Sequence, residues 1–372
     1  MKILHVYRTY YPDPPGGLQE AIRQIAVSTR AFNVESRVFT LSPNPMPAEI
    51  QRDEARVIRR RSLAAPASCD IGGISSFLCF AEAAKWADVI HYHFPWPFAD
   101  LLHQVVHPKV PAIMTYHSDI VRQRWLAQLY NPLMRQTLKS MVTIVATSPA
   151  YAQTSPVLSA PDIAPKVRVI PLGIDASTYQ KWEDASILGR LNLSNSELFF
   201  LFIGVLRYYK GVHYLIEAAL HIKAKVVVAG SGPELAKLKV QAQQLGASNI
   251  IFAGQINDEE KVFLLRHCRA LVLPSHLRSE AYGMVLVEAS MFGKPMISCE
   301  IGTGTSFVNA DGVTGIVIPP ENSQALAKAM ELLLENDALV SQFGDSARIR
   351  YQEMFSGEKL AHAYCELYRN CA

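Results

Sequence analysis

The stretch LFFLFIGVLRYYKGVHYLIEAALHIKAKVVVAG, residues 198–230, contains one complete unit of a parallel α/β fold. A bulky apolar run (198–204) ends in glycine, a segment with helical spacing follows (211–220), and a second β-branched run (225–230) also ends in glycine. Two strands separated by an amphipathic helix are typical of a parallel pair joined by a crossover. The stretch therefore predicts strand, helix and strand in the order of a doubly wound sheet.

The same alternation of short apolar runs and helix-like segments extends in both directions along the chain. It fills residues 2–170, stops at a polar, irregular interval (175–197), and continues from residue 198 to about residue 320. A chain of 372 residues exceeds what one hydrophobic core usually organises. We expect an α/β protein with two doubly wound domains in tandem, closed by a C-terminal tail of two or three helices.

The composition excludes several classes of protein. The chain is 49% apolar and 19% charged with a formal net charge of +3, so it carries no uniform attraction for nucleic acid. The one basic run, Arg52–Ser62, is interpreted as a solvated loop or an edge strand. The six cysteines form no CxxC pair, which favours a reducing cytoplasm. The N-terminus has too short an apolar core for a signal peptide, and the longest apolar run is about half of a membrane span, so any membrane contact is expected to be peripheral.

Ligands of open parallel sheets bind outside the carboxyl ends of the strands. In the first half, Gly16 and Gly17 precede a helix, where backbone amides can approach a ligand, although a tight turn explains them equally well. His91 and His93 alternate on a later strand, but no third ligand lies nearby in sequence, so a metal is not expected; packing and a site at the strand end both remain open. No metal site is predicted elsewhere.

The next strand ends in TYHSD, which places His117, Ser118 and Asp119 at the carboxyl edge. A polar cluster is hard to explain there as core, and a functional role is favoured over a structural one. In the second half, GVLRYYKG places Arg207 and Lys210 in the loop before a helix, where both cations suit phosphate oxygens; an ordinary basic loop is the alternative.

The stretch SEAYGMVLVEAS, residues 279–290, has two carboxylates eight positions apart around a helix start near Gly283. The amides of about Gly283 to Leu286 face no intrahelical acceptor and favour an anion such as a diphosphate. Glu288, inside this apolar helix, suits a vicinal diol such as a ribose, and Glu280 can reach the far side of the phosphate. The alternative is that Glu280 only complements the helix dipole and Glu288 is solvated.

Together these motifs resemble the retaining glycosyltransferases of the GT-B fold, in the large family 4 (group 1) that includes bacterial mannosyl- and rhamnosyltransferases. The resemblance covers nearly the whole chain and rests on the paired glycines, TYHSD, PLGID (171–175), the KG of GVLRYYKG, GSGP and the two glutamates. It implies two Rossmann-like domains facing a central cleft, with a C-terminal helix crossing back to the first domain. The implied ranges are an acceptor-binding domain (1–173), a nucleotide-sugar-binding domain (174–354) and the final helix (355–372).

The resemblance also implies roles for single residues. Glu288 binds the donor ribose, Glu280 the hydroxyls of the donor sugar, and Lys210 neutralises the diphosphate. One departure is that Val205 occupies the usual arginine position, and Arg207 is expected to make that phosphate contact instead. The implied catalytic set is His117, Glu280, Lys210 and Arg207; the donor set adds Gly16, Gly17, Ala281, Tyr282, Gly283, Met284, Val285, Leu286 and Glu288, and His117, Ser118 and Asp119 lie on the acceptor side.

The implied reaction transfers a hexose, mannose or rhamnose, from a nucleotide sugar, with GDP favoured, to an undecaprenyl-linked or other lipid-linked glycan in surface polysaccharide synthesis. No metal or other cofactor is expected, because cations and a helix terminus can stabilise the leaving diphosphate. We expect the enzyme in the cytoplasm, peripheral on the inner face of the inner membrane, with other polysaccharide-assembly enzymes as partners. The alternatives are a UDP-sugar-dependent transferase, a sugar-phosphate synthase, a GT-B epimerase with a soluble acceptor, and a non-catalytic sugar-nucleotide binding module.

Overall fold

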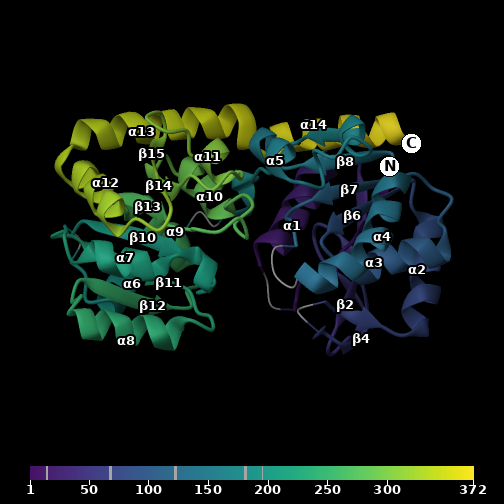
Figure 1. Ribbon diagram of the computed structural model, residues 1–372, viewed down its shortest axis with the longest axis horizontal. Helices are drawn as coiled ribbons and strands as arrows, with labels where there is room; N and C mark the ends of the chain where they lie inside the picture. Colours follow the sequence, from purple (N-terminus) through teal and green to yellow (C-terminus); the bar gives the residue numbers. More distant parts are fainter. Residues whose placement is uncertain (14–15, 67–68, 121–123, 180–181, 195) are drawn as a thin grey trace. The chain divides into compact units, whose positions relative to one another are not determined.

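The computed structural model describes residues 1–13, 16–66, 69–120, 124–179, 182–194 and 196–372. The chain divides into two compact units, which are shown in Figure 1. Unit 1 comprises residues 1–173 and 357–372, and unit 2 comprises residues 174–356. Each unit is a mainly parallel sheet covered by helices, as the alternating sequence pattern predicts.

Nine strands form the sheet of unit 1 within its described residues, in the order β3-β4-β2-β1-β6-β7-β8-β9 with β5 beside β4. Strands β3 and β5 pair antiparallel with β4, and the other pairings are parallel. The bounds are β1 Lys2–Val6, β2 Glu35–Ser42, β3 Glu49–Gln51, β4 Arg56–Ala64, β5 Ile71–Gly72, β6 Val89–Phe94, β7 Ala112–Tyr116, β8 Thr143–Ala146 and β9 Val167–Val169. The helices are α1 Gly17–Arg30, α2 Ile74–Trp86, α3 Pro97–Val106, α4 Arg124–Ser140, α5 Pro149–Thr154 and the short η2 Ala164–Lys166.

Unit 2 has a parallel sheet in the order β12-β11-β10-β13-β14-β15. The strands are β10 Phe199–Ile203, β11 Lys225–Ala229, β12 Ile250–Gly254, β13 Ala270–Leu273, β14 Met296–Cys299 and β15 Gly315–Ile318. The helices and turns are η3 Ala176–Thr178, α6 Ser186–Arg190, η4 Tyr208–Lys210, α7 Val212–Ala219, α8 Leu235–Leu245, α9 Asp258–His267, α10 Met284–Met291, α11 Thr305–Val308, α12 Ser323–Glu335, α13 Asp337–Arg350 and the π-helical η5 Tyr351–Phe355. The stretch at 198–230 is β10, α7 and β11, as predicted.

The C-terminal helix α14, Gly357–Cys371, follows unit 2 in sequence but packs in unit 1 beside α1. Its apolar face joins the core of the first sheet through Leu360, Tyr364 and Tyr368, which contact a cluster that includes Ile3 and Val89. Two of these side chains also make buried hydrogen bonds, one between Tyr364 and Thr115 and one between Tyr368 and His91. The return of this helix to the first unit confirms the expectation from the family resemblance.

The basic segment that was expected to be a solvated loop or an edge strand is mostly an inner strand. Strand β4 pairs with β2 over six residue positions on one side and with the three-residue strand β3 on the other. Its Arg59 is only 4% exposed and donates to Ser42 Oγ at 2.8 Å and to the Asn44 carbonyl at 2.8 Å. The interpretation was wrong because a buried arginine with polar partners has the same sequence signature as a solvated one.

Candidate functional site

The loops that follow β10 and β13 lie side by side, because these two strands are paired. The first loop carries Lys210 and the second carries Ser275 and Glu280. Lys210 Nζ forms an ion pair with Glu280 Oε2, and Ser275 Oγ donates to the same carboxylate oxygen at 3.1 Å. The side chains of Lys210 and Glu280 are only 13% and 10% exposed. The structure thus brings together two of the predicted site residues at the carboxyl edge of the second sheet.

The environment of Lys210 keeps its ammonium charged. Burial by itself would lower the pKa of Lys210, but the neighbouring Glu280 carboxylate and the Tyr209 hydroxyl raise it above its ordinary value. Glu280 uses Oε2 for its contacts with Lys210 and Ser275, and no hydrogen bond reaches its Oε1 from the residues that the structure describes. A carboxylate held by one oxygen can still accept hydrogen bonds from a ligand hydroxyl with the other.

Helix α10 begins directly after this loop. Its N-cap is Gly283, whose φ of 83° is in the left-handed region that favours glycine. Leu286 N–H donates to the Gly283 carbonyl at 2.8 Å, so this amide is already used, whereas the first-turn amides of Met284 and Val285 have no acceptor within the helix. Thr303 Oγ1 donates to the Glu280 carbonyl at 2.8 Å and steadies the loop. Two amides of the predicted set therefore suit an anion best.

Glu288 lies in the second turn of α10, as predicted, and is only 6% exposed. Its Oε1 accepts hydrogen bonds from Tyr179 Oη at 2.6 Å and from Lys261 Nζ at 2.7 Å. Among the described residues, no hydrogen bond is made to Glu288 Oε2. Glu280 and Glu288 thus share one arrangement, in which each carboxylate binds a lysine through one oxygen and its second oxygen accepts no hydrogen bond from the described residues.

The other members of the predicted donor set differ in their surroundings. Arg207 is exposed and, with His213, Glu234 and Gln241, lines a hollow of about 270 Å³ between α7 and α8. Gly17 starts α1 in unit 1, and a Cβ atom there would meet no described atom within 4 Å, so its backbone can be approached closely. Gly16 is the N-cap of the same helix in an extended conformation. Ala281 is half-buried and Tyr282 is buried in the loop before α10.

In unit 1, the segment after β7 has one histidine and two polar residues with different environments. His117 is 7% exposed, and burial lowers the pKa of its imidazole to about 3, which keeps the ring neutral. Its Nε2 lies 3.0 Å from His93 Nδ1. Asp119 Oδ1 accepts from Ser155 Oγ at 2.6 Å and from Tyr116 Oη at 3.1 Å, which holds it against its own unit. Ser118 is half-buried between them.

Next to His117, inside unit 1, is a buried group of histidines whose proximity the sequence did not reveal. His91 and His93 were left open between packing and a site at the strand end; both are buried, at 0% and 1% exposed. A third histidine does lie beside them, His5 from the adjacent strand β1, and one nitrogen of each ring falls within 4.8 Å of the others, close enough to hold a metal ion. Absence of a third ligand nearby in sequence was therefore no argument against a metal. His5 Nδ1 and both nitrogens of His93 and of His91 are engaged in hydrogen bonds, those of His91 with hydroxyls, whereas His5 Nε2 has no partner among the described residues.

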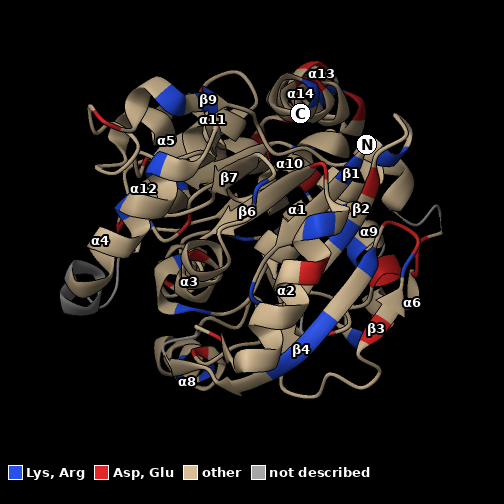
Figure 2. Ribbon diagram, turned by 90° about the vertical axis from the view of Figure 1, so that its right-hand side faces the viewer, with Lys and Arg blue, Asp and Glu red and all other residues tan. Residues whose placement is uncertain are grey.

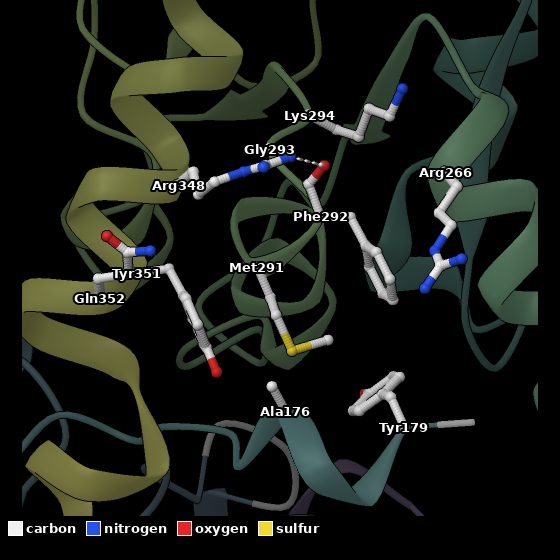
Figure 3. Close-up of a pocket in the computed structure, with 10 residues that line it drawn as sticks. All are labelled: Ala176, Tyr179, Arg266, Met291, Phe292, Gly293, Lys294, Arg348, Tyr351 and Gln352. Carbon is white, nitrogen blue, oxygen red and sulfur yellow. Dashed lines mark hydrogen bonds between the residues drawn. The ribbon is translucent and has the colours of Figure 1, made fainter. Parts of the chain in front are cut away.

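A hollow of about 560 Å³ lies at the other end of α10, shown in Figure 3. The lining side chains include Tyr179, whose ring lies edge-on to Phe292 at 5.9 Å between centroids, and Arg348, which donates to the Phe292 carbonyl at 3.5 Å. None of the residues predicted for the site lines it. Its relation to the site is indirect, since Tyr179 borders the hollow with its ring and holds Glu288 with its hydroxyl.

Comparison with known proteins gives the same assignment for both halves of the chain. Residues 16–173 match the glycosyl transferase 4-like domain, and residues 185–350 match the family of glycosyl transferases group 1. The chain is 42% identical to O-antigen chain mannosyltransferase C of Escherichia coli over 99% of this chain and 98% of that protein. It is 43% identical to D-rhamnosyltransferase WbpZ of Pseudomonas aeruginosa over 96% of this chain and 92% of that protein. The chain is a group 1 glycosyltransferase.

The fold of this glycosyltransferase agrees with the assignment. Sucrose-phosphate synthase from Thermosynechococcus elongatus superposes with a TM-score of 0.81, covering 99% of this chain and 98% of the other at 23% identity. The GT-B fold with two doubly wound units is thus confirmed. The family match and the two relatives at 42% and 43% identity show that the chain is a hexosyltransferase. Among the described residues of the enzyme, no helix is long and apolar enough to cross a membrane.

Sequence reasoning missed several side chains that contact the candidate site residues of the glycosyltransferase, among them three that bind Glu288 or His117. Lys261 and Tyr179 bind Glu288, and His93 binds His117. Lys261 begins the second turn of a helix with the acidic start NDEE, and nothing in that segment marks it as a partner of Glu288. The signal for His93 was present, because His91 and His93 occupy alternate positions of the strand next to the one that His117 follows.

Proposed function

We propose that this glycosyltransferase is a retaining enzyme that moves mannose or rhamnose from a nucleotide sugar, with GDP as the favoured base, to a lipid-linked glycan in surface polysaccharide synthesis. The relatives at 42% and 43% identity, whose names specify mannosyl and rhamnosyl transfer, support the choice of sugar and pathway. The single observation that carries the proposal is the pair of carboxylates around the start of α10, each with one oxygen on a lysine. This arrangement suits a ligand with hydroxyls at both ends and an anion between them.

The donor is bound by residues of unit 2. Glu288 Oε2 accepts from the ribose hydroxyls, and Glu280 Oε1 accepts from the hydroxyls of the transferred sugar. The amides of Met284 and Val285, together with the ammonium of Lys210, hold the diphosphate between them. Arg207 is exposed and supplies a weaker, more solvated contact to the phosphates. Ala281, Tyr282, Gly283 and Leu286 shape the loop that presents these groups.

Residues of unit 1 serve the acceptor and the reacting end of the donor. His117 contacts the transferred sugar near its reacting carbon, and Ser118 and Asp119 bind on the acceptor side. Gly16 and Gly17 let the backbone approach the phosphate or the acceptor closely. The domain roles follow, with residues 1–173 binding the acceptor, 174–354 binding the donor, and 355–372 forming the returning helix.

The chemical step breaks the bond between the anomeric carbon and the diphosphate oxygen. The acceptor oxygen forms its bond to that carbon on the same face, and the acceptor proton passes to an oxygen of the departing diphosphate. Lys210 and the α10 amides stabilise the negative charge that grows on the leaving group, so the reaction needs no metal ion or other cofactor. The competing reaction is hydrolysis, which exclusion of water suppresses.

The reaction takes place in the cytoplasm, with the enzyme held peripherally on the inner face of the membrane that carries its acceptor. Supporting this, Figure 2 shows the basic strand β4 beside α2, and their surface exposes large apolar side chains: Leu63 at 65%, Ile74 at 80% and Leu78 at 67%. Apolar side chains next to arginines suit an anionic lipid surface. Other polysaccharide-assembly enzymes are possible partners at the same surface.

Incubation of the purified enzyme with GDP-mannose, GDP-rhamnose and UDP-glucose tests the function. A polyprenyl-diphosphate-linked glycan is the acceptor, and the product is analysed by mass spectrometry. The proposal predicts a glycan longer by one hexose with one of the GDP sugars, formed equally well in excess chelator. Lengthening with UDP-glucose alone would contradict the donor assignment. Conversion of the sugar nucleotide without glycan lengthening would favour the epimerase or synthase with a soluble acceptor.

A further inference from the structure

Three histidine rings form a hydrogen-bonded row inside unit 1. His5 comes from β1, His93 from the neighbouring strand β6, and His117 follows β7, the next strand in the sheet. His5 Nδ1 lies 3.1 Å from His93 Nε2, and His93 Nδ1 lies 3.0 Å from His117 Nε2. The rings of each neighbouring pair are stacked, with centroids 5.4 Å and 5.3 Å apart. The row therefore connects the interior of the sheet to a residue at its carboxyl edge.

All three rings are neutral. Burial lowers the pKa of His5 and of His117 to about 3 and that of His93 well below its ordinary value, where His91 and His117 lower it further. A neutral imidazole has one N–H and one lone pair. In a row of this kind the direction of one hydrogen bond sets the next. Only two arrangements remain, with every ring protonated on Nδ1 or every ring protonated on Nε2.

The two ends of the row decide between these arrangements. His5 Nε2 is buried and has no hydrogen-bond partner in the described part of the chain. If the rings were protonated on Nε2, this buried atom would be an N–H without an acceptor, and such orphaned donors are rare in folded proteins. If the rings are protonated on Nδ1, the buried His5 Nε2 has only a lone pair. This arrangement also places the N–H of His117 on Nδ1, for which the described residues offer no hydrogen bond.

We propose that His5 and His93 are positioning residues that fix His117 in the Nδ1–H tautomer, so that His117 offers a hydrogen-bond donor, and not a base, to its ligand. His5 Nδ1–H donates to His93 Nε2, and His93 Nδ1–H donates to His117 Nε2. A sugar hydroxyl or ring oxygen is the acceptor that suits the free Nδ1–H. That last identification rests on the proposed function, whereas the tautomer of His117 exists without substrate and is tested separately.

The neighbouring His91 does not belong to the row. Its Nδ1 lies 2.8 Å from Tyr368 Oη and its Nε2 lies 2.7 Å from Thr115 Oγ1. Hydroxyl groups can donate or accept, so these partners suit either tautomer of His91. His91 therefore places no constraint on His117, and it provides an internal comparison among the buried histidines.

Nitrogen NMR of the full-length enzyme labelled with ¹⁵N-histidine tests the tautomer directly, because protonated and unprotonated ring nitrogens have well-separated shifts. Signals are assigned by loss of single peaks in His5→Asn, His93→Asn and His117→Asn variants. The proposal predicts protonated Nδ1 and unprotonated Nε2 for all three residues at neutral pH. Protonated Nε2 at His117 would overturn it, as would a stoichiometric metal ion on His5 and His93, which would occupy the lone pairs that form the row.

A pair of variants at one position separates the positioning role from packing. His5→Asn keeps an amide where Nδ1 of the ring meets His93, whereas His5→Leu removes the hydrogen bond and fills the space. We expect His5→Leu to lower kcat by about ten-fold with little change in KM, and His5→Asn to retain activity within about two-fold. The lower kcat of His5→Leu should be accompanied by changed ¹⁵N shifts of His117, with values between those of the two tautomers. Equal activity of the two variants, or unchanged His117 shifts in His5→Leu, would contradict the role. If His117 shows the predicted tautomer in an enzyme that transfers no sugar, the proposed function fails and the tautomer assignment stands.

Discussion

Lys261 Nζ lies 2.7 Å from Glu288 Oε1, and the two side chains come from neighbouring helices of unit 2, α9 and α10. The carboxylate is 8% exposed and the lysine 22% exposed, so the pair is largely shielded from solvent. A shielded ion pair of this kind fixes the direction of the carboxylate more firmly than a solvated one. Lys261 therefore orients Glu288 for its ligand, although no motif in the sequence marks it.

Replacing Lys261 by Ala should weaken donor binding and destabilise unit 2. Of its partners among the described residues, Glu288 then keeps only Tyr179. We expect the Kd for the nucleotide to rise about ten-fold and the free energy of unfolding to fall by about 2 kcal/mol. Calorimetric titration with GDP and chemical denaturation measure the two effects. Lys328→Ala, at an exposed position of α12, is the matched control and should change neither. Nucleotide binding equal to wild type in Lys261→Ala would refute the orienting role.

Lys210 and Arg207 should differ in their importance for transfer. Lys210 is shielded and paired with Glu280, whereas Arg207 is exposed. We expect Lys210→Ala to lower kcat by about 100-fold, because a preorganised cation on the leaving group is lost, and Arg207→Ala to lower it by less than about ten-fold. Steady-state kinetics with saturating acceptor measure both values, with thermal unfolding as the check on folding. A larger loss in Arg207→Ala would show that this arginine has taken over the phosphate contact.

The stability of unit 1 should depend on pH through Asp100. This carboxyl group is buried on α3, where it accepts a hydrogen bond from Tyr130 Oη, and burial raises its pKa to about 8 from an unfolded value of 3.8. A raised carboxyl pKa gives its full contribution to stability below pH 3.8 and loses it as the pH rises to about 8. Asp100→Asn cannot ionise. Its stability relative to wild type should therefore increase between pH 4 and pH 8 by several kcal/mol, since one pKa unit corresponds to about 1.4 kcal/mol, and then level off.

Denaturation curves of both proteins at several pH values measure this difference. Asp337→Asn is the control, because Asp337 is 92% exposed and its replacement should give a small difference with no rise towards pH 8. A difference between Asp100→Asn and wild type that does not depend on pH would contradict the shifted pKa.

The docking of α14 should depend on its two buried tyrosine hydroxyls. Tyr368→Phe removes the hydrogen bond to His91 Nδ1 at 2.8 Å and leaves a buried nitrogen with one partner fewer. We expect the free energy of unfolding to fall by about 1–2 kcal/mol. Tyr214→Phe, at a half-buried residue on α7, serves as the control and should change stability by less than about 0.5 kcal/mol. Equal effects of the two substitutions would show that the hydroxyl of Tyr368 contributes nothing to docking.

The alternating pattern of the sequence was sufficient to predict both sheets and the position of Glu288 in its helix. This succeeded because strand and helix periodicities are local properties of the chain. The partners of the site were not predictable in this way: Tyr179 is 109 positions from Glu288, and His5 is 88 positions from His93. Only the order of strands in the folded sheet brings such residues together. Arg59 shows the same limit, because its partners Ser42 and Asn44 come from the segment at the end of a neighbouring strand.

The central claim is that Glu288 and Glu280 hold the two ends of one sugar nucleotide. Calorimetric titrations of wild type, Glu288→Gln and Glu280→Gln with GDP and with GDP-mannose test it most directly. The account predicts that Glu288→Gln weakens binding of both ligands by about ten-fold or more, because both contain the ribose. Glu280→Gln should weaken GDP-mannose and leave GDP nearly unchanged. Equal losses for the two ligands in Glu280→Gln, or wild-type affinity of Glu288→Gln for GDP, would contradict the account.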